Sequence, residues 1–426
     1  MKFAPRTYAI DFGTSNSLLA AVSPEQIRSD VPIDPSAADP TIFRSVMYLV
    51  DRHECHFGER AMTEYIARGS EGRLLRSLKR FLPAIDFNVT YVGAQAFTLE
   101  DLIGGLLRQL RERANRFFDT DVSRVMLGRP ARFSDDAAAD RLAQDRLERA
   151  ARLAGFDDIA FCPEPVAAAH DFARDEQREQ LVLVGDFGGG TSDFSVVRLS
   201  QRTFSDADVL AIGGVSLAGD ALDSALMRAK AARHFGAELR YKVPFGSNVL
   251  SMPKPLLARL SSPAEITLMR RSDVIDFVKN LRAWSLSAED KGYMENLLTL
   301  IEDGLGFQLF ESIERAKREL SSAEEARIVF DYPSLDIDEP VRKDELEAAI
   351  ADAVRAIFAS LDDTLRRAGI SAEQIDVVCL TGGTGRVPVI AEGLTRIFRH
   401  ARIHRLRSLH AVVQGLAERA RSLSQG

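Results

Sequence analysis

The segment 181–197, L-V-L-V-G-D-F-G-G-G-T-S-D-F-S-V-V, constrains the fold of this chain more than any other stretch. Its apolar run 181–184 is too short for a helix and rich in branched aliphatic residues, which predicts a buried strand. The second apolar run, 194–199, supplies a strand that returns beside the first. The segment therefore predicts a β-hairpin whose turn is acidic and rich in glycine.

This turn has the composition of a phosphate site. Its three glycines are Gly188, Gly189 and Gly190. They have no Cβ, so we expect positive φ angles and N–H groups that converge on an anionic oxygen, with the Thr191 hydroxyl beside them. Carboxylates such as Asp186 and Asp193 would repel a phosphate unless a cation lay between, which favours Mg²⁺ bound largely through water. A glycine linker is the alternative, but linkers are not framed by two strand-like runs.

The same pattern occurs near the N-terminus. Segment 7–12 is a strand candidate that runs into D-F-G-T-S-N-S, which begins at Asp11, and segment 18–22 resumes the apolar run. A repeated phosphate hairpin predicts two similar lobes that face one nucleotide. Protein kinases also contain D-F-G, but this sequence has no H-R-D loop and no G-x-x-x-x-G-K-[ST] loop. The kinase and P-loop folds are therefore excluded.

The overall composition limits the number of domains and the kinds of partner. A chain of 426 residues is too long for one hydrophobic core, so we expect two domains or lobes. The net charge of −7, with both signs interspersed, argues against nucleic acid or an anionic membrane as the main partner. We find neither a signal core nor a run of about 18 apolar residues, so we expect a cytoplasmic protein.

Strand-like and helix-like segments alternate along the chain, which is typical of an α/β layer. The helix 134–154 is expected to have Ser134 as its N-cap and to end before Gly155. Glu164 is expected at the start of the next helix, where Pro165 is tolerated in the first turn. The other expected helices are 58–68, 98–118, 344–368 and 409–422, and the other expected strands are 46–50, 122–127, 328–330 and 375–380.

Two further segments place polar or glycine residues where a ligand could be bound. E-R-A-K-R-E-L-S sets four residues at steps of three and four, hence on one helix face: Glu314, Lys317, Arg318 and Ser321. By itself this segment predicts a salt-bridged helix face. T-G-G-T-G-R, from Thr381, is a third glycine turn between a strand and a helix, where the backbone can approach a ligand.

Segment 236–263 is rich in proline and turn residues, so we expect an inserted loop without a continuous helix. Its apolar residues either pack on the host lobe or stay exposed for a partner. Basic residues concentrate between 396 and 407, and we interpret them as surface charge rather than a nucleic-acid patch because the whole chain is acidic.

These stretches, in this order and over nearly the whole chain, resemble the nucleotide-binding region of the seventy-kilodalton heat-shock protein family. I-D-F-G-T-S-N-S is similar to the first phosphate motif, G-D-F-G-G-G-T-S-D to the second and E-P-V-A-A-A to the connecting motif. E-R-A-K-R-E-L-S is similar to the adenosine motif and L-T-G-G-T-G-R-V-P to its partner. Five motifs in register are a specific signal. G-R-P-A-R-F and the long insert look most like the YegD-like branch of chaperone-like proteins.

The resemblance implies an α/β, two-lobed actin-like ATPase with a ribonuclease-H-like duplicated fold and a nucleotide cleft. Lobe I would be 1–176 with 404–426 returning to it, and lobe II would be 177–403 with an insert at about 236–313. ATP or ADP with Mg²⁺ would be bound between the lobes. The chain ends where the family continues into a peptide-binding domain, so we expect no peptide-binding domain of its own.

The resemblance also assigns roles to residues. Gly13, Thr14 and Ser15 would bind the β-phosphate side, and Gly188, Gly189 and Thr191 the γ side, with Gly190 as a further cofactor-binding residue. Asp11, Glu164 and Asp186 would order the water ligands of Mg²⁺, with Asp193 and Gly214 beside them. Glu314, Lys317, Arg318 and Ser321 would contact ribose and adenine, with Gly382, Gly383 and Arg386 on the other side. Leu409 stands where the family has an acid near the magnesium site.

Lys79, in K-R-F-L, falls where the family places a lysine that orients the attacking water. The resemblance therefore groups Lys79 with Glu164, Asp186 and Thr191 as catalytic residues. The alternative is a solvated surface lysine.

The function expected from this resemblance is a chaperone-like ATPase that slowly hydrolyses Mg-ATP. A protein client or a cochaperone would sense lobe closure, and neither nucleic acid nor a membrane is expected as partner. Two alternatives belong to the same superfamily. An actin-like polymer predicts nucleotide-dependent sedimentation, and a small-molecule kinase requires an aspartate for a substrate hydroxyl, which we could not assign.

Overall fold

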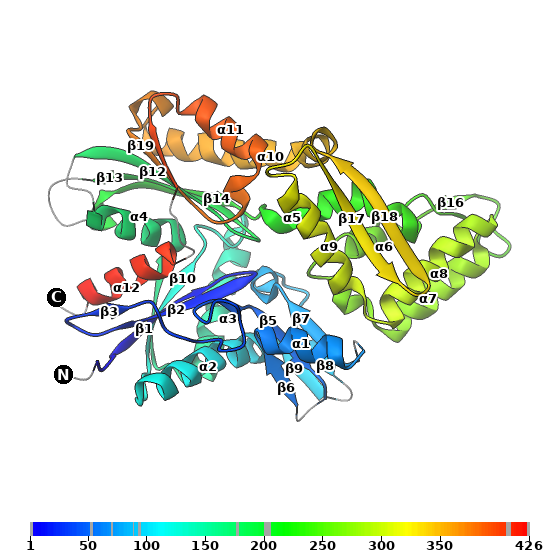
Figure 1. The fold of residues 1–426 in the computed structure, drawn as a ribbon, viewed down its shortest axis with the longest axis horizontal. Coiled ribbons are helices and arrows are strands. Elements are labelled where there is room, and N and C mark those ends of the chain that lie inside the picture. Colours follow the sequence, from blue (N-terminus) through cyan, green and yellow to red (C-terminus); the bar gives the residue numbers. More distant parts are fainter. Residues whose placement is uncertain are drawn as a thin grey trace. The chain divides into compact units, whose positions relative to one another are not determined.

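The computed structural model describes residues 3–51, 54–69, 71–87, 89–92, 95–175, 179–199, 206–405 and 410–423 (Figure 1). The chain forms two compact units, each described by itself below. The first consists of Met1–Glu64, Arg76–Gly219 and Val354–Gly426, and the second of Tyr65–Leu75 and Asp220–Ala353. These units divide the chain at other positions than the expected lobes 1–176 and 177–403, which remain a prediction.

The first unit contains a sheet built on the N-terminal hairpin. Its strand order is β3–β2–β1–β10–β11, and β4 also pairs with β2. The hairpin strands β1 and β2 are antiparallel, whereas β10 is parallel to β1 and β11 is parallel to β10. The bounds are β1 (Thr7–Phe12), β2 (Asn16–Val22), β3 (Ile27–Arg28), β4 (Phe43–Arg44), β10 (Arg124–Arg129) and β11 (Asp158–Pro163).

A second sheet of the same unit repeats this arrangement around the central hairpin. Its order is β14–β13–β12–β19–β20, with an antiparallel hairpin β12–β13 and parallel strands β19 and β20. The bounds are β12 (Gln180–Phe187), β13 (Ser192–Leu199), β14 (Val209–Val215), β19 (Val377–Thr381) and β20 (Arg402–Arg405). Both predicted hairpins are confirmed, and because the two sheets share one strand order, the fold is duplicated.

Two helices connect these sheets through a shared core. They are α4 (Glu164–Asp175), which follows β11, and α12 (Ala411–Leu423). Side chains of both helices and both sheets form one buried cluster, in which Val166, Val184 and Val413 take part. The helices approach so closely that a Cβ added at Gly415 would lie 1.6 Å from the carbonyl oxygen of Ala167. Contact between the helix backbones therefore requires glycine at this position.

The other helices lie close to their expected positions, with one correction. The N-cap of α3 is Asp136, whose side chain accepts the N–H groups of Ala138 and Ala139, and not Ser134. A carboxylate satisfies two otherwise unpaired N–H groups here, and Ser134 instead accepts the N–H of Asp136. The bounds are α1 (Glu59–Ala67), α2 (Leu99–Phe118), α3 (Ala137–Leu153), α10 (Lys343–Ala368) and α11 (Pro388–Ile397). The short strands are β5 (Val46–Leu49), β6 (Cys55–Phe57), β7 (Arg73–Arg76), β8 (Val89–Val92) and β9 (Gln95–Thr98).

The second unit is mostly helical and contains one long hairpin. The helix α5 continues into a π-helix (Met227–Ala231) and a 3-10 helix (Ala232–Phe235). The predicted short strand 328–330 is longer than expected, and its partner β18 was missed although its buried and exposed residues alternate strictly. The bounds are α5 (Gly219–Leu226), α7 (Ser272–Trp284), α8 (Ala288–Glu302), α9 (Gly306–Glu319), β17 (Glu325–Tyr332) and β18 (Leu335–Arg342).

The expectation of an irregular insert at 236–263 is wrong in part. The segment forms a small hairpin, β15 (Arg240–Tyr241) with β16 (Leu250–Ser251), and a helix α6 (Lys254–Leu260). Pro255 lies in the first turn of α6, where its missing N–H costs nothing. Leu256 and Leu260 are buried, as expected if the insert packs on the rest of the protein. Phe245, at the tip of the hairpin, is fully exposed.

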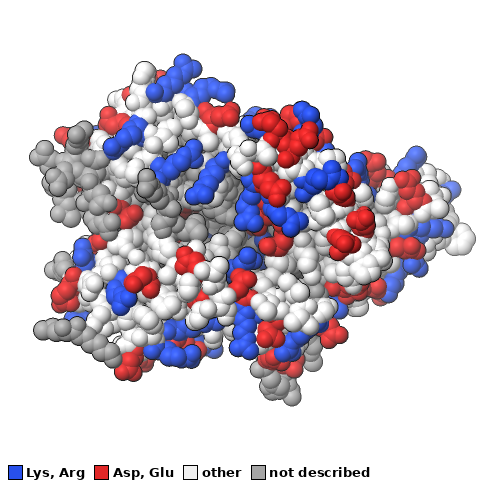
Figure 2. Space-filling view, viewed as in Figure 1, with Lys and Arg blue, Asp and Glu red and all other residues white. Residues whose placement is uncertain are grey.

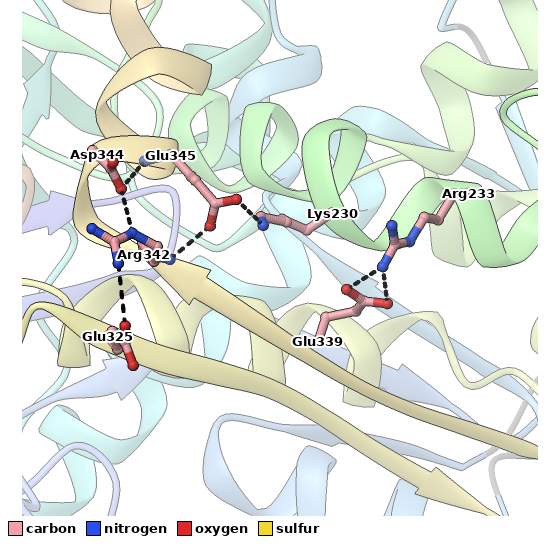
Figure 3. A network of polar contacts seen from close by, with 7 residues as sticks. All are labelled: Lys230, Arg233, Glu325, Glu339, Arg342, Asp344 and Glu345. Carbon is pink, nitrogen blue, oxygen red and sulfur yellow. Dashed lines mark hydrogen bonds and ion pairs between the residues drawn. The ribbon is translucent and has the colours of Figure 1, made fainter.

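Charged side chains on the surface are interspersed, as the composition suggested, and Figure 2 shows both signs mixed over the face in view. Two sets of polar contacts join the helical segment after α5 to the hairpin β17–β18 and to the start of α10 (Figure 3). Their members are Lys230, Arg233, Glu325, Glu339, Arg342, Asp344 and Glu345. The nearly buried Glu339 accepts from Arg233 and pairs with His234 at 2.6 Å. Among the described residues, no helix is long and apolar enough to cross a membrane.

Candidate functional site

The turns of the two hairpins face each other within the first unit. A Cβ added at Gly189 would lie 2.6 Å from Ser15 Oγ, and one at Gly190 would lie 2.7 Å from Thr14 Oγ1. The structure thus brings together the two glycine turns that the sequence places far apart. The expected positive φ is wrong, because none of Gly188, Gly189 and Gly190 is among the residues with positive φ. Glycine is needed here because a side chain would fill the space between the turns.

The third glycine turn packs against the central one. Gly382 has a φ of 82°, and a Cβ there would lie 2.1 Å from the carbonyl oxygen of Phe187. Thr384 Oγ1 donates a hydrogen bond of 2.8 Å to the carbonyl oxygen of Gly188. The sequence motif T-G-G-T-G-R contains Thr384, but the motif alone does not single out this residue as part of the site. Gly383 borders open space and Arg386 is exposed, so these two predicted contacts lie on the open side of the turn.

Lys79 lies inside the protein and not on its surface. It belongs to a 3-10 helix (Leu78–Phe81), is 6% exposed, and its Nζ donates a 2.5 Å hydrogen bond to Glu164 Oε1. The alternative of a solvated surface lysine is therefore wrong. Glu164 is the first residue of α4, as expected, and it too is buried.

Four carboxylates and one ammonium group share this enclosed space. Loss of hydration, followed by the charge of Glu164, raises the pKa of Asp186 to about 8 and that of Asp193 to about 7. The pKa of Asp11 is also raised well above its usual range, first by burial and then by Glu164. Burial alone would lower the pKa of Lys79, but the charges of Glu164 and Asp11 outweigh it and raise the pKa. The single positive charge of Lys79 is therefore too small to neutralise all four carboxylates.

Asp193 has one oxygen with a partner and one without. Its Oδ1 accepts the N–H of Ala131 at 2.7 Å, whereas its buried Oδ2 meets no hydrogen-bond donor among the described residues. Gly214 lies opposite in the ladder, and a Cβ there would be 2.4 Å from Asp193 Oδ1. The absence of a side chain at Gly214 thus leaves space for the Asp193 carboxylate. The contact of Asp193 with the backbone N–H of Ala131 could not be predicted from a sequence motif, because motifs specify side chains.

The Asp193 Oδ2 atom is buried without a partner among the residues described, and the pKa values of Asp11, Asp186 and Asp193 are raised. Both observations are consistent with a site for a cation and its water molecules. The described residues include no group of three His, Cys, Asp or Glu side chains that converge as direct metal ligands. The residues present therefore fit Mg²⁺ that is held mainly through water and phosphate.

The predicted adenosine segment lies in the second unit. Glu314, Lys317 and Arg318 are on α9, and Ser321 follows its end and is exposed. Lys317 Nζ lies 2.8 Å from Asp223 Oδ1 on α5, and both side chains are nearly buried. A salt-bridged helix face predicts ion pairs within α9. Lys317 does form an ion pair, but its partner Asp223 lies on another helix. Leu409 lies outside the described residues.

Asp223 should make the stability of the protein depend on pH. Burial, only partly offset by Lys317, raises its pKa to about 6. The folded protein then keeps a proton that the unfolded chain loses near pH 4, so the free energy of unfolding should fall as the pH rises from about 4 to about 6. Denaturant unfolding of Asp223→Asn should show a smaller fall over this range, and the remainder comes from the other buried carboxylates with a raised pKa, Asp186 and Asp193. The exposed Asp331→Asn variant is the control and should follow the wild type, and parallel profiles for all three proteins would refute the assignment.

The duplicated sheets and the facing glycine turns define the class of this protein as an α/β protein of the actin-like ATPase fold. The sequence profile described as Hsp70 protein matches residues 82–297 and 302–425. The chain belongs to the Hsp70 family, because this match covers well over half of it.

Two curated relatives show how far the similarity extends. The chain is 27% identical over 417 residues to a protein named Chaperone protein DnaK from Thermosipho melanesiensis, which covers 97% of this chain and 59% of that protein. It is 26% identical over 393 residues to Chaperone protein DnaK from Thermosipho africanus, which covers 91% of this chain and 54% of that protein. The chain thus spans somewhat more than half the length of the curated relatives it matches.

Proposed function

We propose that this chain binds Mg-ATP through the facing glycine turns and hydrolyses it slowly. The observation that carries this proposal is the approach of Gly189 and Gly190 to Ser15 and Thr14, beside a carboxylate cluster with one buried lysine. Two glycine turns from repeated hairpins offer backbone N–H groups and hydroxyls to a phosphate chain from both sides. An arrangement that served stability alone would not gather several carboxylates whose pKa values are raised.

Each part of the cluster has a distinct proposed role. Asp11, Glu164 and Asp186 would hold Mg²⁺ through its water molecules, and the bound ion would neutralise charge on the β- and γ-phosphates. Lys79, held by Glu164, directs a fixed positive charge toward the γ side, where it orients a water molecule and offsets developing charge. Thr191 and Thr384 frame the central turn, and the Thr384 hydroxyl holds the Gly188 carbonyl oxygen in place.

The remaining assignments are proposals that follow from the family. Contacts of Glu314, Arg318 and Ser321 with ribose and adenine are supported by their exposed or partly exposed positions on and after α9, and Lys317, which is paired with Asp223, is proposed beside them. Coupling of the nucleotide state to a protein client or a cochaperone is proposed on the same basis, since the curated relatives are named chaperones.

The proposal is tested by the effect of Mg-ATP on thermal stability. At ten times its dissociation constant, a ligand adds about 1.4 kcal/mol to the free energy of unfolding, which should raise the melting temperature of the wild type. Gly189→Arg should abolish this rise, because a side chain at position 189 would occupy the space beside Ser15 Oγ.

Gly292→Ala is the matched control, because position 292 lies on α8 and borders open space. It should respond to ATP like the wild type. The melting temperature without ligand shows whether Gly189→Arg folds. A folded Gly189→Arg protein that ATP stabilises as strongly as the wild type would contradict the proposed site.

A further inference from the structure

A shallow, open groove lies between α11 and β20, and the nucleotide site does not use it. It consists of two hollows of about 500 and 620 Å³, which adjoin because Thr395 and Arg405 line both. Its polar lining comes from α11, the turn after it and β20: Glu392, Thr395, Arg396, Arg399, His404 and Arg405. All of these residues belong to the first unit.

The floor of the groove ends in an open sheet edge. β20 is the last strand of its sheet, and within the described part of the chain no strand pairs with its outer side. The Arg402 N–H donates to the Asp376 carbonyl oxygen at 2.9 Å, on the inner side. Hydrogen bonding alternates along a strand, so Ile403 and Arg405 direct their N–H and C=O groups to the outer edge. An edge of this kind is a template for another extended chain.

The side chains around this edge are mainly basic. Arg396, Arg399 and Arg405 line the groove against one carboxylate, that of Glu392. Two of the guanidinium groups are held by backbone oxygens, Arg399 by Arg396 and Arg405 by Gly385. The groove is therefore a cationic strip beside the outer edge of β20, on a protein whose net charge is −7.

We propose that this groove binds an acidic, extended segment of a partner protein, which adds to the sheet as a strand next to β20. Main-chain hydrogen bonds to Ile403 and Arg405 would provide affinity, and acidic side chains at every second position would meet the guanidinium groups. This binding does not depend on the proposed nucleotide function.

A polypeptide fits the groove better than a nucleic acid. The backbone edge of β20 matches the hydrogen-bonding groups of a peptide main chain, which a nucleic acid lacks. The lining residues include no Phe, Tyr or Trp on which a base could stack. The acidic protein as a whole would also repel a long polyanion, whereas a short acidic segment meets only the local positive charge.

Fluorescence anisotropy with a labelled peptide of four Glu-Val repeats tests the proposal. The wild type should bind this peptide, and the double variant Arg396→Glu with Arg399→Glu should bind it at least tenfold more weakly. A peptide methylated on alternate main-chain nitrogens should also bind at least tenfold more weakly, because it cannot pair with a strand edge. A Lys-Val peptide of the same length should not bind.

Arg116→Glu with Arg141→Glu is the matched control, because it changes the net charge equally at exposed positions of α2 and α3. This variant should bind the Glu-Val peptide like the wild type. Three results would overturn the proposal: no binding by the wild type, equal binding by the two double variants, or equal binding of the methylated peptide. Preferential binding of a single-stranded RNA of similar length would assign the groove to nucleic acid instead.

Discussion

Lys79→Ala is expected to slow single-turnover ATP hydrolysis by at least about a hundredfold, which corresponds to about 2.7 kcal/mol in the barrier. The structure buries the Lys79 ammonium beside the carboxylate cluster, where its charge acts on both Asp186 and Asp193. Its charge matters most when negative charge develops on the γ-phosphoryl group, so ATP affinity should stay within about threefold of the wild type. Rapid-mixing turnover and equilibrium nucleotide binding measure the two quantities separately.

Arg80→Ala is the matched control for Lys79→Ala. Arg80 is the next residue of the same 3-10 helix but is exposed, so its removal should change neither hydrolysis nor affinity. Loss of Lys79 leaves the Glu164 carboxylate buried without its partner, and thermal unfolding must show that the variant still folds. If hydrolysis and affinity fall by the same factor, or if neither changes, Lys79 has no role specific to the transition state.

Gly415→Ala is expected to destabilise the protein by about 3 kcal/mol or more. The added Cβ would lie 1.6 Å from the carbonyl oxygen of Ala167 and 2.4 Å from its carbonyl carbon. These are backbone atoms of α4, so no change of rotamer can relieve the overlap, and the two helices must separate. Denaturant unfolding measures the loss, which appears as a lower midpoint at a similar slope.

Two further variants separate the backbone clash from other causes. Gln414→Ala changes the neighbouring, partly exposed position of α12 and should stay within about 0.5 kcal/mol of the wild type. Ala167→Gly combined with Gly415→Ala should not recover stability, because the clash involves the backbone of residue 167 and not its methyl group. A Gly415→Ala protein as stable as the wild type would show that α4 and α12 are not in this close contact.

Local sequence pattern predicts some elements of this fold and fails for others. Segments 7–22 and 181–199 fold as predicted because a strand, a glycine turn and a second strand are specified by neighbouring residues. Local pattern failed at the start of α3, where the N-cap is Asp136 and not the predicted Ser134. The Asp136 carboxylate accepts two backbone N–H groups of the first turn. It also failed for 236–263, because prolines next to turn residues hid a short hairpin and a helix that begins beside Pro255.

The sequence by itself determined the two hairpins, their repetition and the family, because each of these rests on the order of residues along a short stretch. Only the tertiary structure decided which distant groups meet. It placed Lys79 against Glu164, Ser15 against Gly189, and the Thr384 hydroxyl against the Gly188 carbonyl oxygen. Hydrophobic periodicity specifies which face of an element is buried, but contact between elements depends on how the sheets and helices pack. For this reason, burial changes Lys79 from one charged residue among many into the central cation of the carboxylate cluster.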